Sequence, residues 1–246
     1  MRRYGLIGFP LGHSFSQKYF TQKFEADGTD ARYDLFPLES ISELPKLLGD
    51  IDNFMGFNVT IPYKQDVMQF LDDIDEQARE IGAVNVVKIS YAGGKRTLKG
   101  FNSDAYGFTE SIRPMLGASH KKALVLGSGG ASKAVVYSLR KLGVEPVIVS
   151  RHAAEGVLTY ADLSSEVMSE YTVIVNASPV GMAPKVDACP SIPYECLTPA
   201  HVCFDLVYNP EETLFLKKAK AQGAAVKNGL EMLHLQAEGA WLYWNE

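Results

Sequence analysis

Three glycines, Gly127, Gly129 and Gly130, lie between an expected buried strand and an expected helix in the stretch 125–134, VLGSGGASKA. Glycines here let the backbone approach a pyrophosphate closely, and the start of the helix supplies free N–H groups. The dinucleotide fingerprint G-x-G-x-x-G is incomplete, because Ser132 takes the place of its third glycine. The turn predicts a dinucleotide site, and the alternative is a tight turn that binds no ligand.

A P-loop is not predicted at the same turn. Its pattern requires a glycine just before Lys133 and a hydroxyl residue just after it. Ser132 and Ala134 stand at those positions. A P-loop phosphotransferase is therefore disfavoured.

The strand expected at 145–151, EPVIVSR, ends in residues that bear on the choice of dinucleotide. An NAD site places an Asp or Glu about 20 residues after the glycines, against the ribose 2′-hydroxyl. Ser150, Arg151 and His152 stand there instead, so no carboxylate repels a 2′-phosphate and an arginine can pair with it. NADP is the predicted cofactor, and the alternative for Arg151 is a solvated surface charge.

Polar residues also stand at strand ends in the first half of the chain. Ser14 and Ser16 open an expected helix, and their hydroxyls suit a carboxylate, although Ser14 could instead only cap the helix. In the stretch 57–64, FNVTIPYK, a proline makes a strand end rigid just before Lys64. Further polar residues of this kind are Thr60, Asn85 and Asp104. Ligands of open α/β folds bind at the carboxyl edge of the sheet, where we expect these side chains to converge.

The elements that must position these residues alternate along the chain. Expected strands lie at 2–8, 31–38, 54–60, 83–90 and 97–102, and helical stretches at 14–27, 40–49, 64–71 and 75–81. This order predicts a mostly parallel sheet with one hairpin around Gly93-Gly94. A second α/β half follows near residue 104, beginning with the apolar strand KALVLG.

Composition limits the class of protein. The chain of 246 residues has a net charge of −5 and a pI near 5.6, which argues against nucleic-acid or anionic-membrane partners. No apolar run approaches the roughly 18 residues of a membrane span. The three cysteines form no C-x-x-C pair, which fits a reducing cytoplasm, and the scattered histidines predict no metal site.

Eight motifs together carry a resemblance to a known family. In chain order from Gly12 to Gln236 they are GHSFS, NVTIPYK, AVN, NSDAYGF, GSGGASKA, NASPVGM, DLVYNP and GLEMLHLQ. With them the chain resembles shikimate dehydrogenase. The resemblance implies an α/β enzyme with a cleft between two domains, a substrate-binding domain of mostly parallel sheet at 1–103 plus 232–246 and a Rossmann-type NADP-binding domain at 104–231. It also implies reduction of 3-dehydroshikimate to shikimate with NADPH, on the route to aromatic amino acids.

The resemblance also implies a role for each matching residue. Lys64 and Asp104 would be the catalytic pair. The substrate would contact Ser14, Ser16, Thr60, Asn85, Tyr208 and Gln236, although Gln236 could instead be only the polar edge of an apolar helix stripe. The cofactor would contact Gly127, Ser128, Gly129, Gly130, Ala131, Ser150, Arg151, Ser178, Leu206, Gly229 and Met232. The only partner implied is a small-molecule substrate, and the chain is expected to be a monomer or homodimer.

The chemistry of Lys64 follows from these roles. Ketone reduction leaves negative charge on oxygen, which must be stabilised and protonated. A lysine is ordinarily protonated at neutral pH, and the Asp104 carboxylate would keep it so. Lys64 would therefore donate the proton in reduction and would have to lose it before oxidation.

Some positions depart from the family pattern. Val86 replaces the threonine of A-V-N-T, Ser103 and Ala105 flank Asp104, and the strand before Arg151 lacks the expected Asn and Thr neighbours. The last change removes adenosine-phosphate contacts and weakens the expected preference for NADP. Two alternatives stay open: a quinate/shikimate dehydrogenase that uses NAD, and a non-catalytic dinucleotide-binding regulator on the same fold.

Overall fold

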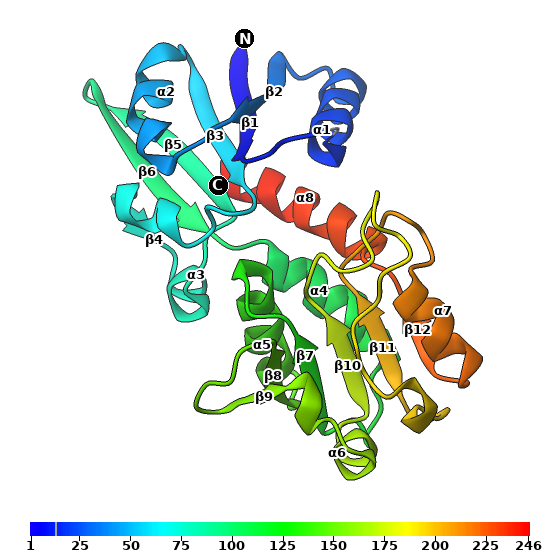
Figure 1. Cartoon of the computed structure of the whole chain (residues 1–246). Coiled ribbons are helices and arrows are strands. Elements are labelled where there is room, and N and C mark those ends of the chain that lie inside the picture. The colour runs from blue at the N-terminus through cyan, green and yellow to red at the C-terminus, as the bar shows by residue number, and fades with distance from the viewer. Residues whose placement is uncertain (13) are drawn as a thin grey trace. The chain divides into compact units, whose positions relative to one another are not determined.

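Two sheets of six strands each carry the fold (Figure 1). The computed structural model describes residues 1–12 and 14–246. Contacts divide the chain into a first unit, Met1–Ser103 with Ala237–Glu246, and a second unit, Asp104–Gln236. The last helix, α8 (Leu230–Asn245), is continuous through residue 237, where the chain returns to the first unit.

The first unit contains a mixed sheet of order β2-β1-β3-β5-β6-β4. Its strands are β1 (Arg2–Gly8), β2 (Ala31–Pro37), β3 (Phe54–Val59), β4 (Asp73–Ile74), β5 (Val86–Ala92) and β6 (Lys95–Phe101). Its helices are α1 (Phe15–Ala26), α2 (Leu44–Asp50) and α3 (Glu76–Ile81), with 3-10 turns η1 (Ile41–Glu43) and η2 (Asp66–Phe70). Strands β1, β2 and β3 are parallel, whereas β5 is antiparallel to both β3 and β6. The expected hairpin joins β5 to β6, and both turn glycines have positive φ.

The second unit has a wholly parallel sheet of order β12-β11-β10-β7-β8-β9. Its strands are β7 (Lys122–Leu126), β8 (Glu145–Ser150), β9 (Val157–Thr159), β10 (Val173–Asn176), β11 (Val202–Asp205) and β12 (Ala225–Lys227). Its helices are α4 (Asp104–Ile112), α5 (Gly130–Lys141), α6 (Ser165–Glu170) and α7 (Leu214–Ala221), with 3-10 turns η3 (Arg113–Met115), η4 (Tyr160–Asp162) and η5 (Tyr194–Cys196).

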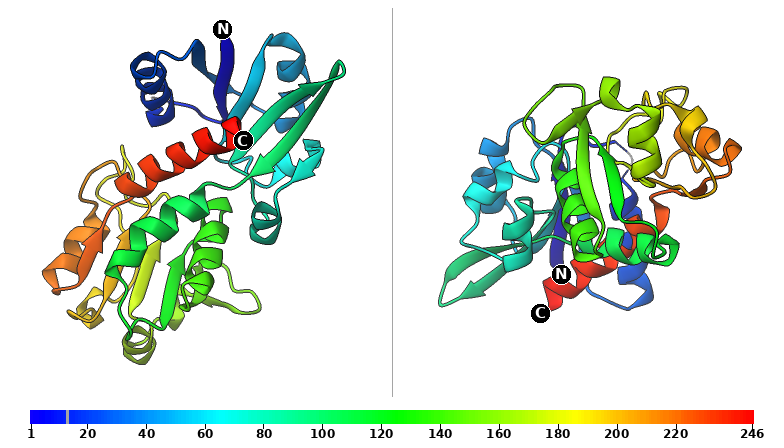
Figure 2. Two further views of the ribbon diagram at one scale, coloured as in Figure 1. Left: turned by 180° about the vertical axis from the view of Figure 1, so that it is seen from behind. Right: turned by 90° about the horizontal axis from the view of Figure 1, so that it is seen from below.

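Alternate residues of β7 explain why this second sheet is covered on both faces. Ala123 and Val125 are buried against α4 and α5, while Leu124 and Leu126 are buried in the cluster with α6 and α7. Figure 2 shows α4 and α5 together on one side of the sheet. Together with the parallel order, this confirms the predicted Rossmann-type α/β fold.

The first unit is layered in a similar way. One face of its sheet packs on α2 through Leu44 and Leu48. The other face carries an aromatic cluster in which α1 and the end of α8 pack on Tyr4, with Trp244 at a ring-centroid distance of 4.7 Å. The Trp244 indole N–H donates to the Val87 carbonyl at 3.0 Å, which ties the C-terminal helix to a central strand.

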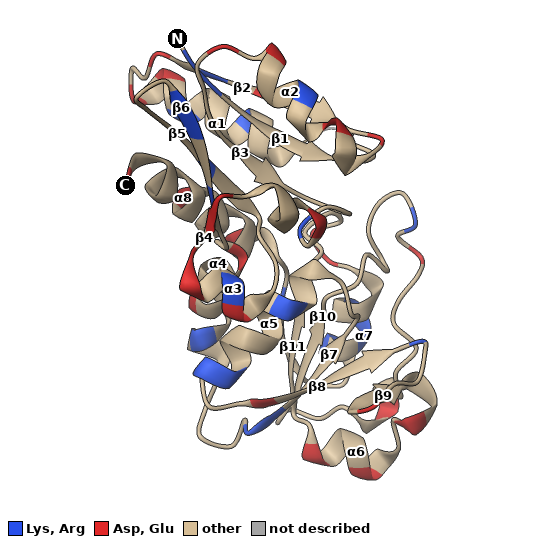
Figure 3. Cartoon of the chain, turned by 90° about the vertical axis from the view of Figure 1, so that its left-hand side faces the viewer, with Lys and Arg blue, Asp and Glu red and all other residues tan. Residues whose placement is uncertain are grey.

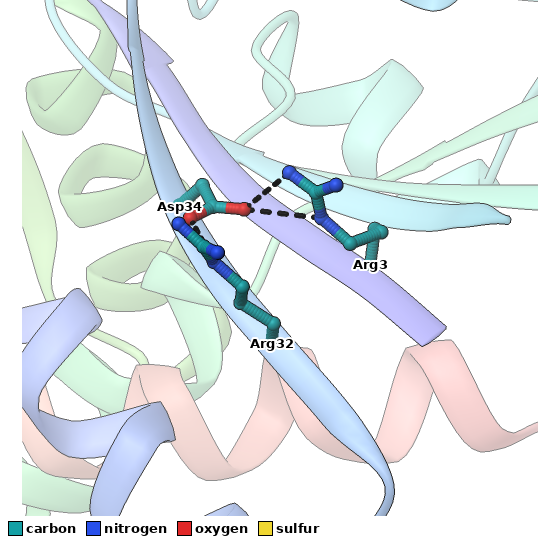
Figure 4. A network of polar contacts seen from close by, with 3 residues as sticks. All are labelled: Arg3, Arg32 and Asp34. Atoms are coloured by element: carbon teal, nitrogen blue, oxygen red, sulfur yellow. Dashed lines mark hydrogen bonds and ion pairs between the residues drawn. The ribbon is translucent and has the colours of Figure 1, made fainter. Parts of the chain in front are cut away.

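An ion-pair network joins the edge strand β2 to its neighbour β1. Asp34 accepts hydrogen bonds from Arg3 Nε at 3.1 Å and Nη2 at 2.6 Å, and from Arg32 Nε at 2.6 Å (Figure 4). The register places Arg3 directly beside Arg32, so the shared carboxylate offsets the repulsion of two neighbouring cations. In the view of Figure 3, basic and acidic residues are interspersed over both units.

The structure differs from the sequence-based expectation at a few short segments. The stretch predicted as helical at 64–71 is only the 3-10 turn Asp66–Phe70. Strands β4 and β9 and helix α6 were not predicted. Elements of two to six residues show no reliable periodicity, and their form is set by the surrounding tertiary contacts.

Candidate active site

The polar residues predicted in the first unit lie at one edge of its sheet. Strands β1 and β3 are parallel with Ile7 beside Val59, so the segments that follow both strands leave the same edge. Strand β5 runs the opposite way, which brings Asn85, the residue before it, to that edge as well. The Val59 N–H donates to the Asn85 carbonyl at 2.9 Å, and the Thr60 N–H donates to the Ile7 carbonyl at 2.9 Å. Thr60 and Asn85 are thus brought together as expected from their strand ends.

The backbone on both sides of Lys64 is anchored. The Lys64 carbonyl accepts the Val84 N–H at 2.7 Å. The buried Tyr63 donates its hydroxyl to the Leu38 carbonyl at 2.7 Å, and its own carbonyl accepts the Val67 N–H at 2.9 Å. These bonds hold the Lys64 backbone beside the segment that carries Asn85. A rigid base of this kind limits the positions that the ammonium group can reach.

A chain of buried and partly buried hydrogen bonds connects several of these groups. The Tyr33 hydroxyl donates to Asn58 Oδ1 at 2.8 Å, and Asn58 Nδ2 donates to the Asn85 carbonyl at 3.3 Å. The two shortest hydrogen bonds between Asn85 and Ser103 join Asn85 Nδ2 to the Ser103 hydroxyl at 3.1 Å and the Ser103 N–H to Asn85 Oδ1 at 2.7 Å. Ser16 hydrogen-bonds the same Tyr33 hydroxyl, whose pKa is raised well above its usual value by burial.

Sequence reasoning missed three members of this chain: Tyr33, Asn58 and Ser103. Asn58 stands in the FNVTIPYK stretch one residue before Val59, so its place at a strand end was a usable signal. Tyr33 carried no such signal, because an aromatic residue inside a strand is ordinarily core. Only the packing of β2 beside β1, and of β1 beside β3, brings its hydroxyl to Asn58.

The two serines before and within α1 lie where predicted. Ser14 is the N-cap residue in extended conformation, yet its hydroxyl makes no capping hydrogen bond. The alternative role of Ser14 as a helix cap therefore has no support in the structure.

Asp104 is the first residue of α4 and is 3% exposed. It directly follows Ser103, which the two bonds with Asn85 fix in place. Gln236, on α8, is the last residue of the second unit, which begins at Asp104. A Cβ placed on Gly107 would lie 3.1 Å from the Gln236 backbone nitrogen. Gly107 therefore permits close packing of α4 against α8.

The glycine turn has the geometry of a phosphate cradle. Gly127 has φ +120°, and a Cβ there would lie 3.2 Å from the Ala177 carbonyl carbon, so only glycine fits without strain. Gly129 is the extended N-cap of α5 with no side-chain cap, and a Cβ there would meet nothing within 4 Å. The buried Ser132 donates its hydroxyl to the Gly129 carbonyl at 2.6 Å. Ser132 thus takes the third glycine's place by bonding the turn, and open space remains above Gly129.

The other predicted cofactor residues follow neighbouring strands of the same sheet. Ser128 belongs to the turn after β7, and Gly130 and Ala131 open α5. Ser150 ends β8 and Arg151 follows it, while Ser178 follows β10, Leu206 follows β11 and Gly229 follows β12. Because all of these strands are parallel, these segments leave one edge of the sheet. Arg151 is exposed. Burial raises the pKa of the nearby Tyr160 hydroxyl, and the positive charge of Arg151 lowers that pKa by less.

Two further predicted site residues, Met232 and Tyr208, are buried or half-buried. Met232 is 7% exposed and packs in the cluster with Phe108 and Phe204. Tyr208 is half-buried after β11, and burial raises the pKa of its hydroxyl. Their contacts with substrate or cofactor remain predictions.

Comparison with known proteins decides the family. The family model for the shikimate dehydrogenase substrate binding domain matches residues 6–87. A shikimate dehydrogenase (NADP(+)) of Caldanaerobacter subterraneus subsp. tengcongensis is 37% identical over 262 residues, covering 98% of this chain and 90% of that protein. The chain belongs to the shikimate dehydrogenase family. The resemblance found in the eight motifs is thereby confirmed.

Solved structures of the family share the fold along the whole chain. Shikimate 5-dehydrogenase from Thermus thermophilus, in complex with NADP(H) and shikimate, is 34% identical with a TM-score of 0.85, covering 99% of this chain and 93% of that one. The Listeria monocytogenes enzyme, in complex with shikimate and NAD, is 27% identical with a TM-score of 0.86, covering 99% and 91%.

Two features of other protein classes are missing from the described residues. None of their helices combines the length and apolar character that crossing a membrane requires. Within residues 1–12 and 14–246, no group of three or more His, Cys, Asp and Glu side chains is arranged to hold a metal ion.

Proposed function

We propose that this enzyme interconverts shikimate and 3-dehydroshikimate with NADP(H). The observation that carries the proposal is similarity along nearly the full chain to NADP-dependent shikimate dehydrogenases, one of them 37% identical. The polar groups at the carboxyl edges of both sheets support it, since they supply an ammonium, a carboxylate, hydroxyls and a glycine turn. The first unit would bind the substrate and the second the dinucleotide.

The catalytic step follows from the chemistry of Lys64 and Asp104. The bound dinucleotide supplies or accepts a hydride at the substrate carbon. Lys64, with its backbone anchored at Val84, would stabilise the developing charge on the carbonyl oxygen and donate a proton to it. Asp104 would accept a hydrogen bond from the neighbouring hydroxyl and orient the ring.

The remaining polar groups of the first unit would hold the substrate. Ser14 and Ser16, at the start of α1, would take the carboxylate. Thr60 and Asn85 would bond ring hydroxyls from adjacent strand ends. The family resemblance adds Tyr208 and Gln236 to the proposed substrate contacts.

The residues of the second unit fit a dinucleotide. The pyrophosphate would lie above Gly129, where the absence of a side chain leaves space and the α5 N–H groups point outward. Arg151 would pair with the 2′-phosphate of the adenosine. Leu206, Gly229 and Met232 would flank the nicotinamide.

The setting of the enzyme follows from its thiols. Cys189, Cys196 and Cys203 are all free, which suits a reducing cytoplasm, where we place the protein. The partner we propose is the small-molecule substrate.

One assay tests the proposed function. The purified enzyme is mixed with shikimate and NADP+, and NADPH formation is followed by absorbance. Turnover with shikimate exceeding turnover with quinate is the expected result. Binding of the dinucleotide without turnover of either substrate would instead favour the non-catalytic regulator.

The pH dependence of the two directions is predicted to differ. Oxidation of the substrate hydroxyl releases a proton, so shikimate oxidation should accelerate as pH rises from neutral toward alkaline values. Reduction takes its proton from the Lys64 ammonium group and should vary less over the same range. Measuring kcat in both directions at each pH checks this, and an oxidation rate that stays flat would contradict the role of Lys64.

Arg151→Ser tests the 2′-phosphate contact. We expect the KM for NADP+ to rise roughly 10- to 100-fold, because a charge-assisted pair is lost, and the KM for NAD+ to change little. Arg140→Ser, at an exposed position of the same unit, serves as the charge-matched control. If Arg151 is only a surface charge, both variants will retain the wild-type KM for both dinucleotides.

A further inference from the structure

Asp205, the last residue of β11, is a fully buried carboxylate surrounded by hydrogen-bond donors. Its Oδ1 accepts the Val207 N–H at 3.0 Å and Asn176 Nδ2 at 2.9 Å. Its Oδ2 accepts the Thr213 hydroxyl at 2.6 Å. A carboxylate without a proton can accept from all three donors, whereas a neutral carboxyl or an amide group would have to reverse the bond with the Thr213 hydroxyl and make it the acceptor.

Asn176 extends this network into the segment after β10. Its Oδ1 accepts both the N–H of Ser178 at 3.2 Å and the Ser178 hydroxyl at 2.7 Å. Its Nδ2, already bonded to Asp205, also donates to the Val180 carbonyl at 3.2 Å. The position of Ser178 therefore depends on the orientation of one amide, and Asp205 fixes that orientation.

The segment after β11 is fixed by the same group. Leu206, next to Asp205, donates its N–H to the Asn176 carbonyl at 2.9 Å. The Val207 carbonyl accepts the Gly229 N–H at 3.2 Å, and a Cβ on Gly229 would overlap the Leu206 carbonyl oxygen. The backbones of Leu206 and Gly229 are thus in direct contact. The hydrogen bond from Val207 to Asp205 fixes the backbone that holds both residues in place.

Burying this charge is costly, which argues for a purpose beyond stability. Burial raises the pKa of Asp205 to about 6, more than the bonds from Thr213, Val207 and Asn176 lower it. The pKa of Asp205 in the folded protein therefore lies above that of an exposed aspartate. The contribution of Asp205 to folding stability is complete only at acid pH and is lost as pH rises through about 6. Tyr194 is the titratable neighbour that senses this charge; its pKa is raised mainly by burial, with Asp205 the last contributor.

We propose that Asp205 is a positioning residue for the dinucleotide. Its carboxylate holds the segments after β10 and β11 at one separation, so that Ser178, Leu206 and Gly229 are presented together to the nicotinamide end of NADP(H). The inference rests on the proposed function for the identity of the ligand. It assigns Asp205 no contact with the substrate or the reacting atoms.

Asp205→Asn is the main test, with steady-state kinetics against each substrate. We expect the KM for NADP+ to rise roughly 10- to 100-fold at pH 7.5, since bonds to a charged group are lost, and the KM for shikimate to change by less than about threefold. Lowering the pH toward 5.5 should weaken NADP+ binding more in the wild type than in Asp205→Asn. The 2′-phosphate of the cofactor also titrates near pH 6. Because it does so in both enzymes, the difference between them isolates Asp205.

Three further variants separate positioning from folding. Thr213→Val removes one donor to Asp205, and Thr213→Ser keeps it; only the valine variant should raise the KM for NADP+, by roughly 5- to 10-fold. Ser164→Ala removes the N-cap of α6 in the same unit and should lower thermal stability without changing that KM.

The outcomes decide between the two ideas. An unchanged KM for NADP+ in both Asp205→Asn and Thr213→Val, or an equal rise for both substrates, overturns the positioning role. A wild-type enzyme that lacks activity on shikimate overturns the proposed function instead. In that case the dissociation constant for NADPH, measured by fluorescence titration of the same variants, tests Asp205 without turnover.

Discussion

Lys64→Ala is expected to lower kcat by roughly 10²- to 10⁴-fold, while the KM for shikimate changes far less. The ammonium acts on charge that develops at the carbonyl oxygen as the reaction proceeds, so its removal affects the transition state more than the ground state. The anchors on its backbone, the bond to Val84 and the buried Tyr63, do not involve the lysine side chain. The variant should therefore fold normally. Initial rates over a range of shikimate concentrations, together with a thermal melt, measure both quantities.

Two comparisons sharpen this test. Lys46→Ala removes an exposed lysine from α2 in the same unit and should leave kcat unchanged. Lys64→Arg keeps the charge but presents it as a planar group that does not readily release a proton, so it should recover little activity. A rise in KM for shikimate with kcat intact would reassign Lys64 to substrate binding.

Gly129→Asp is expected to raise the KM for NADP+ by roughly 100-fold or more without loss of thermal stability. A Cβ at this extended position meets nothing within 4 Å, and aspartate is a favoured N-cap, so α5 should be held at least as well as before. The new charge would stand where the pyrophosphate is proposed to lie. At about 4 Å, two like charges near a protein surface repel by about 4 kcal/mol. Kinetics with NADP+ and a melting curve give the two readouts.

Gly129→Asn provides the matched control for charge. Asparagine has nearly the same size and is an equally good N-cap, so any smaller rise in KM with this variant measures the steric part alone. Equal effects of the two substitutions would show that shape, and not repulsion, excludes the cofactor. Unchanged KM values in both would place the pyrophosphate elsewhere and remove the glycine turn from the cofactor site.

The α/β fold could be predicted because it rests on local sequence patterns that tertiary contacts do not override. The apolar run before Gly127 and the helix after it can be read from sequence because a buried parallel strand and an amphipathic helix each leave a distinct pattern. Short elements such as β9 and η2 were missed or misassigned, since two to five residues carry too little pattern. The same reasoning located polar residues at strand ends, where parallel strands bring their side chains to one edge.

The sequence alone determined which chemical groups this protein carries and which strand ends present them, because residue type and chain order are local properties. It also placed the chain in its family, through motifs spread from Gly12 to Gln236. Only the tertiary structure decided which residues hold the predicted site residues in place. Tyr33 hydrogen-bonds Asn58, and Asp205 hydrogen-bonds both Asn176 and Thr213. Those partners lie 25, 29 and 8 residues apart in the chain. Hydrogen bonds of this kind depend on which strands are neighbours in a sheet, and strand order is settled by packing of the whole domain.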